Sequence, residues 1–349
     1  MGTGTASAVS PTTQHKSAMS SRERWLAALD CRPLDRLPFW PKIGKSYAAA
    51  RTGRFAGVPA GEVHRFVGSD LHERATSCVR TVRAVCSQQT ESDDHERVRT
   101  FQTPHGRLRE VSRYDVGSGS WHPTEFAVKT VEDVKAMTAW YADARVELDV
   151  EGLEKARAQL AESERTGCGI RVSGVTISPL MEWIQHLAGV QNGHFMLLDH
   201  PEEVEALLAA MGRFTLAKAR LVAEHQPADL VYMTENTSTS LISPEQYRKY
   251  CQPILRQVAE ILHAGGKRLC LHMCGLLLDI LLDISEVGAD AWEAFTSPTL
   301  GNTRLADGRA ADAQVCIIGG TNAMMWTRPA GEIIAEIERD LDVLPHHRG

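Results

Sequence analysis

An alternation of strand-like and helical segments, which begins at about residue 168, constrains the fold of this chain more than any other feature. Short apolar runs rich in β-branched residues are each followed by a segment with helical periodicity. The strands that we expect, in chain order, cover Ile170–Val175, Asp229–Thr234, Arg268–Cys274, Ala289–Phe295 and Val315–Gly319. This alternation predicts parallel strands that are joined by helical crossovers.

Two architectures fit such an alternation, a closed (β/α)8 barrel and an open, doubly wound sheet. No G-x-G-x-x-G motif follows an expected strand, and no G-x-x-x-x-G-K-[ST] motif is present. The nucleotide-binding signatures of the open sheet are therefore missing. We predict a (β/α)8 TIM-type barrel.

The first third of the chain departs from this alternation. Residues 1–19 are rich in Gly, Ser, Thr and Ala and lack the apolar centre of a secretory signal, so we expect a disordered tail. Residues 20–349 then form one barrel domain, with a first strand at Arg36–Trp40. A hairpin-rich insertion is expected around 78–128, where a Thr-Pro-His-Gly turn at 103–106 separates two alternating segments. Residues 131–160 return to helical periodicity.

Composition narrows the class of protein. The chain has 349 residues and a net charge of −6, which argues against a nucleic-acid surface as its main function. Its most apolar stretch, Leu276–Ile284, contains Asp279 and Asp283, so we expect no membrane span. Eight irregularly spaced cysteines without an export signal are expected to be reduced thiols, which favours a cytoplasmic protein.

The sharpest chemical feature is the strand-like run from Leu269 to Gly275. Alternate side chains of a strand share a face, so His272 and Cys274 point the same way, at the C-terminal end of their strand. Active sites of barrels lie at that end. An imidazole and a thiolate so placed can both reach one zinc ion. The alternative is an interior histidine with satisfied hydrogen bonds next to a packed thiol.

Polar residues at the ends of neighbouring strands could join this pair. Glu235 and Asn236 follow the strand Asp229–Thr234, where a carboxylate could ligate zinc, act as a general base or bind a cationic substrate group. A solvated carboxylate is the alternative. Glu293 lies between apolar neighbours near another strand end, so it should line the cavity or find a cation.

Two further residues are candidates for substrate binding. Trp40 ends the first expected strand and could form an apolar wall, although a place in the core explains it equally well. Asn322 follows Gly319-Gly320-Thr321, a turn at which the backbone can approach a ligand closely or simply lead into a helix. No G-x-S-x-G elbow and no H-E-x-x-H helix is present, so nucleophile-elbow hydrolases and zincins lack support.

Several short segments, in a specific order and spacing, carry a resemblance to a known family. They are Ser21–Leu29 followed by Asp35–Pro38, then Thr103–Gly106, Leu198–Val204, Leu241–Tyr247 and His272–Gly275. Over residues 20–349 the chain resembles the uroporphyrinogen decarboxylase superfamily, and within it the branch of zinc-dependent, corrinoid-associated methyltransferases. True decarboxylases of this family carry an Arg-Gln-Ala-Gly-Arg segment after the first strand. Here that place, residues 39–46, contains no arginine, which disfavours decarboxylation of a tetrapyrrole with many carboxylates.

The resemblance implies a barrel with its pocket at the C-terminal mouth and a zinc ion held by His272 and Cys274. In that branch zinc binds a thiol such as coenzyme M, and the thiolate takes a methyl group from a methylated corrinoid. The third ligand of the branch is a cysteine on the last strand, whereas this sequence ends at Gly349, at or before the expected place of that strand. Cys316 lies toward the opposite end of its strand, so Glu235 is the candidate for the third ligand.

Together these features predict a zinc-dependent methyltransferase that activates a thiol, with Glu235, His272 and Cys274 as catalytic and metal-binding residues. Trp40, Asn236, Glu293 and Asn322 would bind the substrate. Expected cofactors are zinc and methylcobalamin or another corrinoid, and expected partners are a small-molecule thiol or methylated substrate, with a corrinoid protein and a second copy of the chain as further candidates. One alternative is a metal-free decarboxylase or lyase that acts on a small acid or a tetrapyrrole. Another is a non-catalytic barrel that binds a corrinoid.

Overall fold

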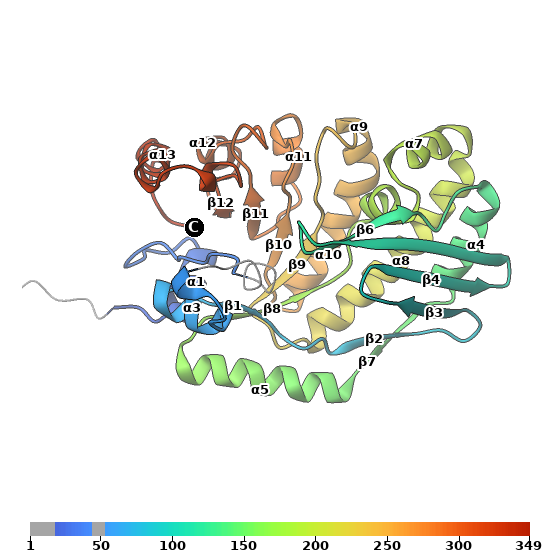
Figure 1. The fold of residues 1–349 in the computed structure, drawn as a ribbon, viewed down its shortest axis with the longest axis horizontal. Helices are drawn as coiled ribbons and strands as arrows, with labels where there is room; N and C mark the ends of the chain where they lie inside the picture. The colour runs from blue at the N-terminus through green and yellow to red at the C-terminus, as the bar shows by residue number, and fades with distance from the viewer. Residues whose placement is uncertain (1–17, 44–52) are drawn as a thin grey trace, which may run out of the picture.

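A parallel sheet of six strands forms the centre of the computed structural model, which describes residues 18–43 and 53–349 (Figure 1). The strands lie side by side in the order β1 (His72–Arg74), β8 (Ile170–Gly174), β9 (Leu230–Thr234), β10 (Leu269–His272), β11 (Ala291–Phe295) and β12 (Cys316–Gly319). The five strands predicted from the alternation are all present, and all their pairings are parallel.

The prediction of a complete (β/α)8 barrel is not confirmed. The sheet curls into a half-barrel, and within the described ranges β1 and β12 remain its two edges. The expected strand Arg36–Trp40 is extended but forms no strand ladder, because its polar groups are held by the side chains described below. After β12 the described chain continues into helix α13 (Ala330–Asp342) and adds no further strand to this sheet.

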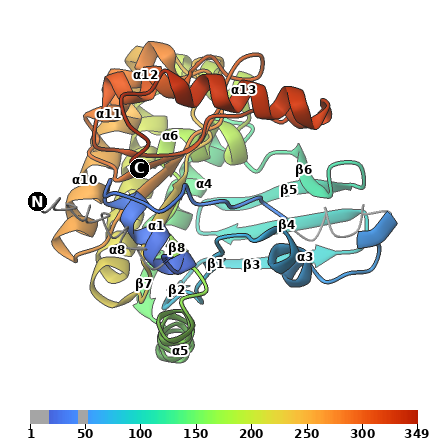
Figure 2. The ribbon, with the colours of Figure 1, turned by 90° about the vertical axis from the view of Figure 1, so that its left-hand side faces the viewer.

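Helix α1 (Ser21–Leu29) lies against the inner face of the curled sheet (Figure 2). Its Trp25, Ala28 and Leu29 pack on inward-facing strand residues. Those partners are Ile170, Val172, Leu230, Cys270, Ala291 and Cys316. Since side chains alternate along a strand, the intervening residues, such as Met233 and Leu271, pack against the outer helices instead. The helix and the inward-facing strand residues therefore form an apolar cluster that fills the inner face of the sheet.

Helices lie between the strands along the chain. They are α4 (Val131–Ala142), α5 (Val150–Thr166), α6 (Pro179–Glu182), α7 (Val190–Asp199), α8 (Pro201–His225), α9 (Pro244–Gln246), α10 (Gln252–Ala264), α11 (Leu281–Ser285) and α12 (Leu305–Ala311). A π-helical turn at Tyr247–Cys251 separates α9 from α10. Pro253 explains this interruption, because proline has no N–H for the helical hydrogen bond. None of the described helices is long and apolar enough to cross a membrane.

An antiparallel sheet stands beside the half-barrel (Figure 1). Its strands are β3 (Ser87–Ser92), β4 (Glu96–Thr103), β5 (Gly106–Asp115) and β6 (Ser120–Glu125). This confirms the hairpin around the turn at 103–106. β2 (Val79–Val82) and β7 (Arg145–Leu148) form a separate antiparallel pair. β7 interrupts the region 131–160, which was predicted to be helical throughout. Helix α3 (Ala60–Val67) precedes β1.

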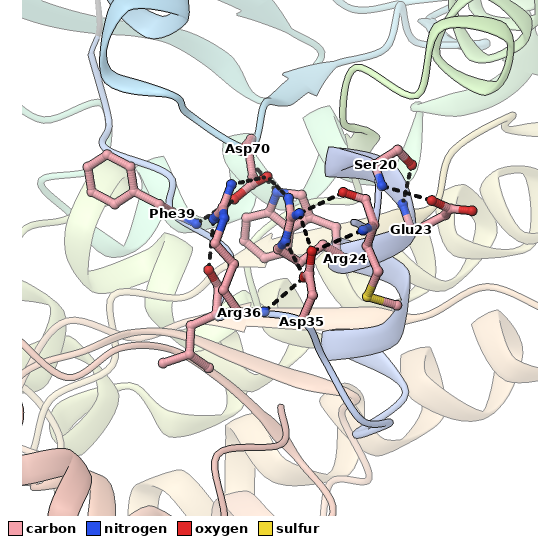
Figure 3. Close-up of polar contacts among 10 residues, drawn as sticks. Ser20, Glu23, Arg24, Asp35, Arg36, Phe39 and Asp70 are labelled. Atoms are coloured by element: carbon pink, nitrogen blue, oxygen red, sulfur yellow. Dashed lines mark hydrogen bonds and ion pairs between the residues drawn. The ribbon is translucent and has the colours of Figure 1, made fainter. Parts of the chain in front are cut away.

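A buried ionic network fixes the segment that follows α1 (Figure 3). Asp70 is 1% exposed and accepts hydrogen bonds from Nη1 of Arg24 at 2.5 Å, from Nη1 of Arg36 at 2.6 Å and from the backbone N–H of Phe39 at 2.8 Å. Arg24 also donates through Nε to Asp35 at 2.8 Å. The network therefore ties the start of α1 to residues 35–39 and to the chain just before β1. The predicted tail, residues 1–19, lies outside the described residues except for its last two.

Candidate active site

His272 and Cys274 lie at the carboxyl end of β10, on the inner side of the half-barrel. Cys270 of the same strand belongs to the inner apolar cluster, so residues two and four positions later follow it on that side. His272 is partly buried, whereas Cys274 is exposed and lines a cavity of about 890 Å³. The thiol of Cys274 lies 3.6 Å from Oδ1 of Asn236. The structure thus brings the predicted pair together at the mouth of the half-barrel.

The carboxylate of Glu293 fixes the orientation of the His272 ring. The parallel register of β10 and β11 places the two residues side by side, and Oε2 of Glu293 contacts Nδ1 of His272. Burial lowers the pKa of His272, but hydrogen bonds with Cys274 and Glu293 raise it by more, to about 9. The contact occupies Nδ1 and leaves Nε2 as the ring nitrogen that can bind a ligand.

Glu293 has the cation that its burial requires. Its side chain is 4% exposed, and its second oxygen, Oε1, contacts the ammonium of Lys42. Burial raises the pKa of Glu293, but the hydrogen bonds and charges of His272 and Lys42 lower it by more. Glu293 is therefore an ionised bridge between two cationic groups. Lys42 was missed in the sequence, although a predicted buried carboxylate implies a nearby cation.

The structure does not bring Glu235 to the pair. Its backbone N–H donates to the carbonyl of His272 at 3.0 Å, but its side chain is 0% exposed and turns to the outer side of the sheet. There the carboxylate accepts hydrogen bonds from the backbone N–H of Ser178 at 2.7 Å and from the Ser178 hydroxyl. Strand alternation already indicates this side, because Tyr232 and Thr234 face inward. The roles of third ligand and base therefore have no geometric support at Glu235.

Substituting Glu235 with glutamine should change the pH dependence of stability without loss of activity. Burial raises the pKa of this carboxyl from 4.5 to about 7, against the hydrogen bonds from Ser178 that lower it. The folded state thus binds the proton more tightly than the unfolded chain, so stability falls as pH rises from 4.5 to about 7. We expect Glu235→Gln to remove this fall and to raise the free energy of unfolding at pH 8 by as much as ~3 kcal/mol.

Urea unfolding of both proteins at pH 5 and pH 8 measures this effect. The difference between the two proteins at each pH isolates Glu235 from other titrating groups. A variant that is less stable at pH 8 would contradict the raised pKa, whereas a loss of bound zinc or of activity would restore Glu235 as a ligand or base.

Asn236 is held by an amide chain. Its Nδ2 donates to Oε1 of Gln185 at 3.1 Å, and Nε2 of Gln185 donates to the carbonyl oxygen of Glu235 at 2.9 Å. Asn236 has a φ of 49°, in the left-handed region that asparagine tolerates better than most residues. These contacts direct Oδ1 of Asn236 to the thiol of Cys274. Gln185 gave no signal in the sequence.

The remaining predicted residues, Trp40 and Asn322, line the same cavity but differ in whether their side chains are available to bind a substrate. Trp40 stacks on His72 with ring centroids 3.9 Å apart and meets Trp25 edge to face. Asn322 is 5% exposed, and its amide is used within the protein, donating to the carbonyl oxygen of Pro298 at 2.7 Å and accepting from Met325 N at 3.0 Å. Asn322 therefore holds the loop after β12, and Trp40 offers an apolar surface.

The donor atoms at the mouth fit part of a zinc site. Nε2 of His272 and Sγ of Cys274 are suitable zinc ligands, and a carboxylate on the other ring nitrogen is the usual partner of a zinc-bound histidine. Among the described residues, however, no group of three or more His, Cys, Asp or Glu side chains is placed to hold a metal ion. The described chain thus supplies two donors.

Comparison with known proteins identifies the family. The family described as Uroporphyrinogen decarboxylase (URO-D) matches residues 123–348, well over half of the chain. This chain belongs to the uroporphyrinogen decarboxylase family. The match covers the half-barrel strands β8 to β12, including both His272 and Cys274, but not β1.

Two methyltransferases of Methanosarcina mazei are similar to this chain. A methylated-thiol–coenzyme M methyltransferase is 31% identical over 113 residues, which are 32% of this chain and 30% of that protein. A solved methyltransferase structure aligns with a TM-score of 0.56 over 93% of this chain and 90% of its own, at 16% identity. The second likeness shows the fold, and the first fits the methyltransferase branch of the family.

Proposed function

We propose that this family member is a methyltransferase that places a methyl group on the sulfur of a small-molecule thiol. The observation that carries the proposal is the contact of His272 with Cys274, which lines the cavity, and with Glu293 at Nδ1 of the imidazole. The M. mazei relative, whose name states a methylated thiol and coenzyme M, supports the same chemistry. The absence of arginine from residues 39–46 argues against a porphyrin substrate with many carboxylates.

Zinc is the proposed cofactor, held by Nε2 of His272 and Sγ of Cys274. When bound there, it would supply Lewis acidity that lowers the pKa of a thiol, so that a thiolate exists at neutral pH. Since the described chain supplies two donors, water or the thiol substrate would occupy the other positions of a tetrahedral ion. We therefore expect weaker zinc binding than at sites with three or four protein ligands.

The other residues have supporting roles in this proposal. Glu293 holds the imidazole through Nδ1, and Lys42 balances the charge of Glu293. Before zinc binds, Asn236 accepts a hydrogen bond from the Cys274 thiol, and this bond would be lost when the thiolate binds zinc. The proposed methyl donor is a methylated corrinoid, presented by a corrinoid protein. The thiolate sulfur would form the new S–C bond while the donor's cobalt–carbon bond breaks and leaves its electron pair on cobalt.

A product assay tests this function. Zinc-loaded protein is mixed with methylcobalamin and a simple thiol such as 1-hexanethiol, and the methyl thioether is measured by mass spectrometry. The proposal predicts thioether in amounts that exceed the enzyme and depend on zinc. A product yield no higher than that of the protein-free mixture, with methylcobalamin and with a methylated thiol as donors, would exclude it.

Substituting Glu293 with glutamine should weaken zinc binding by about 10- to 100-fold. Glutamine keeps the shape of the side chain but not the charge that holds Nδ1 of His272. Competition with a chromogenic chelator measures the affinity. Glu336→Gln is the matched control, because Glu336 lines the same cavity but pairs with Arg328. Equal zinc affinity in the wild type and in Glu293→Gln would show that the carboxylate does not support the metal.

A further inference from the structure

We infer that the methyl-accepting thiol is a bulky, uncharged and largely apolar molecule rather than a small anionic one. This inference rests on the proposed function and adds the class of substrate. It follows from the size of the cavity, from the side chains that line it and from the partners of its charged groups.

The cavity is large for a small thiol. It has a volume of about 890 Å³, near the upper end of the range for sites that bind drug-sized ligands. Cys274 and Glu293 line it, so it is continuous with the proposed site. A two-carbon thiol would leave most of this space to water.

The walls of the cavity are mainly apolar. The side chains that contribute are Trp25, Leu37, Trp40, Ile318, Met325 and Trp326. Several of them come from the segment after α1 and from the loop after β12, which the ionic network and Asn322 hold in place. Apolar walls of this kind bind a ligand in proportion to the apolar surface that leaves water.

The charged side chains that line the cavity within the described ranges are already engaged. Lys42 contacts Glu293, and the Nη atoms of Arg309 donate to the carbonyl oxygen of Val315 at 2.8 Å and to the oxygen of Gly349 at 2.9 Å. The two acidic residues elsewhere in the lining also have partners, Glu336 with Arg328 at 2.7 Å and Asp340 with Arg304 at 3.4 Å.

A sulfonate, carboxylate or phosphate on the substrate would therefore enter an apolar space without a new cationic partner. Removing such a group from water is unfavourable unless a cation or several hydrogen bonds replace the water. An uncharged chain or ring has no such penalty. The cavity should consequently select for apolar bulk and against negative charge.

A series of thiols tests the inference with methylcobalamin as donor. From ethanethiol to 1-hexanethiol, kcat/KM should rise about fourfold with each methylene. 6-Mercaptohexanamide should exceed its isosteric carboxylate, 6-mercaptohexanoate, by at least about tenfold. A flat series, or a preference for the carboxylate, would overturn the inference while leaving thiol methylation intact. Methylation of 2-mercaptoethanesulfonate alone would overturn the inference and leave the proposed function intact. Methylation of neither this small anionic thiol nor any of the series would overturn both.

Two tryptophan variants test whether the selectivity for apolar thiols arises in this cavity. Trp326 lines it and is 56% exposed, so Trp326→Ala should fold normally. We expect this variant to lower kcat/KM for 1-hexanethiol about five- to tenfold and to leave that for ethanethiol within about twofold. Trp121→Ala, on strand β6 of the antiparallel sheet, is the matched control and should change neither. Equal losses for both thiols in Trp326→Ala would contradict the assignment.

Discussion

Replacement of His272 or Cys274 by alanine should abolish stoichiometric zinc binding and lower kcat/KM for thiol methylation by at least about a hundredfold. Each variant leaves one protein donor among the described residues near the mouth, and one donor does not hold zinc at micromolar protein concentrations. Without the metal the thiol substrate keeps a pKa above neutrality, so little thiolate is present. Zinc is measured by elemental analysis after dialysis, and activity by thioether yield.

Cys168→Ala is the control for Cys274→Ala. Cys168 is also an exposed free cysteine, but it follows α5, before the start of β8, and does not line the cavity. It should keep wild-type zinc content and activity. If Cys274→Ala behaves like Cys168→Ala, the pair is not the catalytic centre, and a metal-free reaction in the same cavity becomes the better account.

Asp70→Ala should reduce the free energy of unfolding by about 3–5 kcal/mol. Asp70 is 1% exposed and receives hydrogen bonds from two guanidinium groups and from the N–H of Phe39 (Figure 3). Its loss leaves the charge of Arg24, itself 5% exposed, with Asp35 as its remaining anion. Breaking a buried ion pair by removal of one member is strongly destabilising, because the other member keeps its desolvation penalty.

Urea unfolding monitored by tryptophan fluorescence gives this free energy. The control is Lys155→Ala, which breaks the exposed pair of Lys155 and Glu151 on α5 and should leave stability close to that of the wild type. Similar small changes in both variants would mean that the network does not hold the segment after α1. A large loss in Asp70→Ala should also weaken the placement of Trp40 and Lys42 at the cavity.

The periodic parts of the sequence were sufficient to predict the sheet. β8 to β12 appear where the alternation placed them, because each is a short, largely apolar run between helical segments. Strand parity likewise predicted that His272 and Cys274 lie on one side, and their side chains are in contact. These are local patterns that need no knowledge of distant contacts.

Features that depend on distant contacts could not be predicted in this way. Residues 36–40 have a strand-like composition, but Asp70, more than 30 positions away, binds Arg36 and the N–H of Phe39. The pairing of Lys42 with Glu293 spans most of the chain. Glu235 is different, because the alternation of side chains along its strand already predicts that it points to the outer side of the sheet. We instead assigned it a catalytic role because it is a charged residue at a strand end.

X-ray absorption at the zinc edge, on zinc-loaded protein with and without 1-hexanethiol, tests the central claim most directly. We predict one zinc per chain with one sulfur and at least one imidazole nitrogen as neighbours, from Cys274 and His272. Addition of the thiol should raise the number of sulfur neighbours from one to two. The absence of zinc from the protein, or a sulfur count that the thiol does not change, would contradict the account.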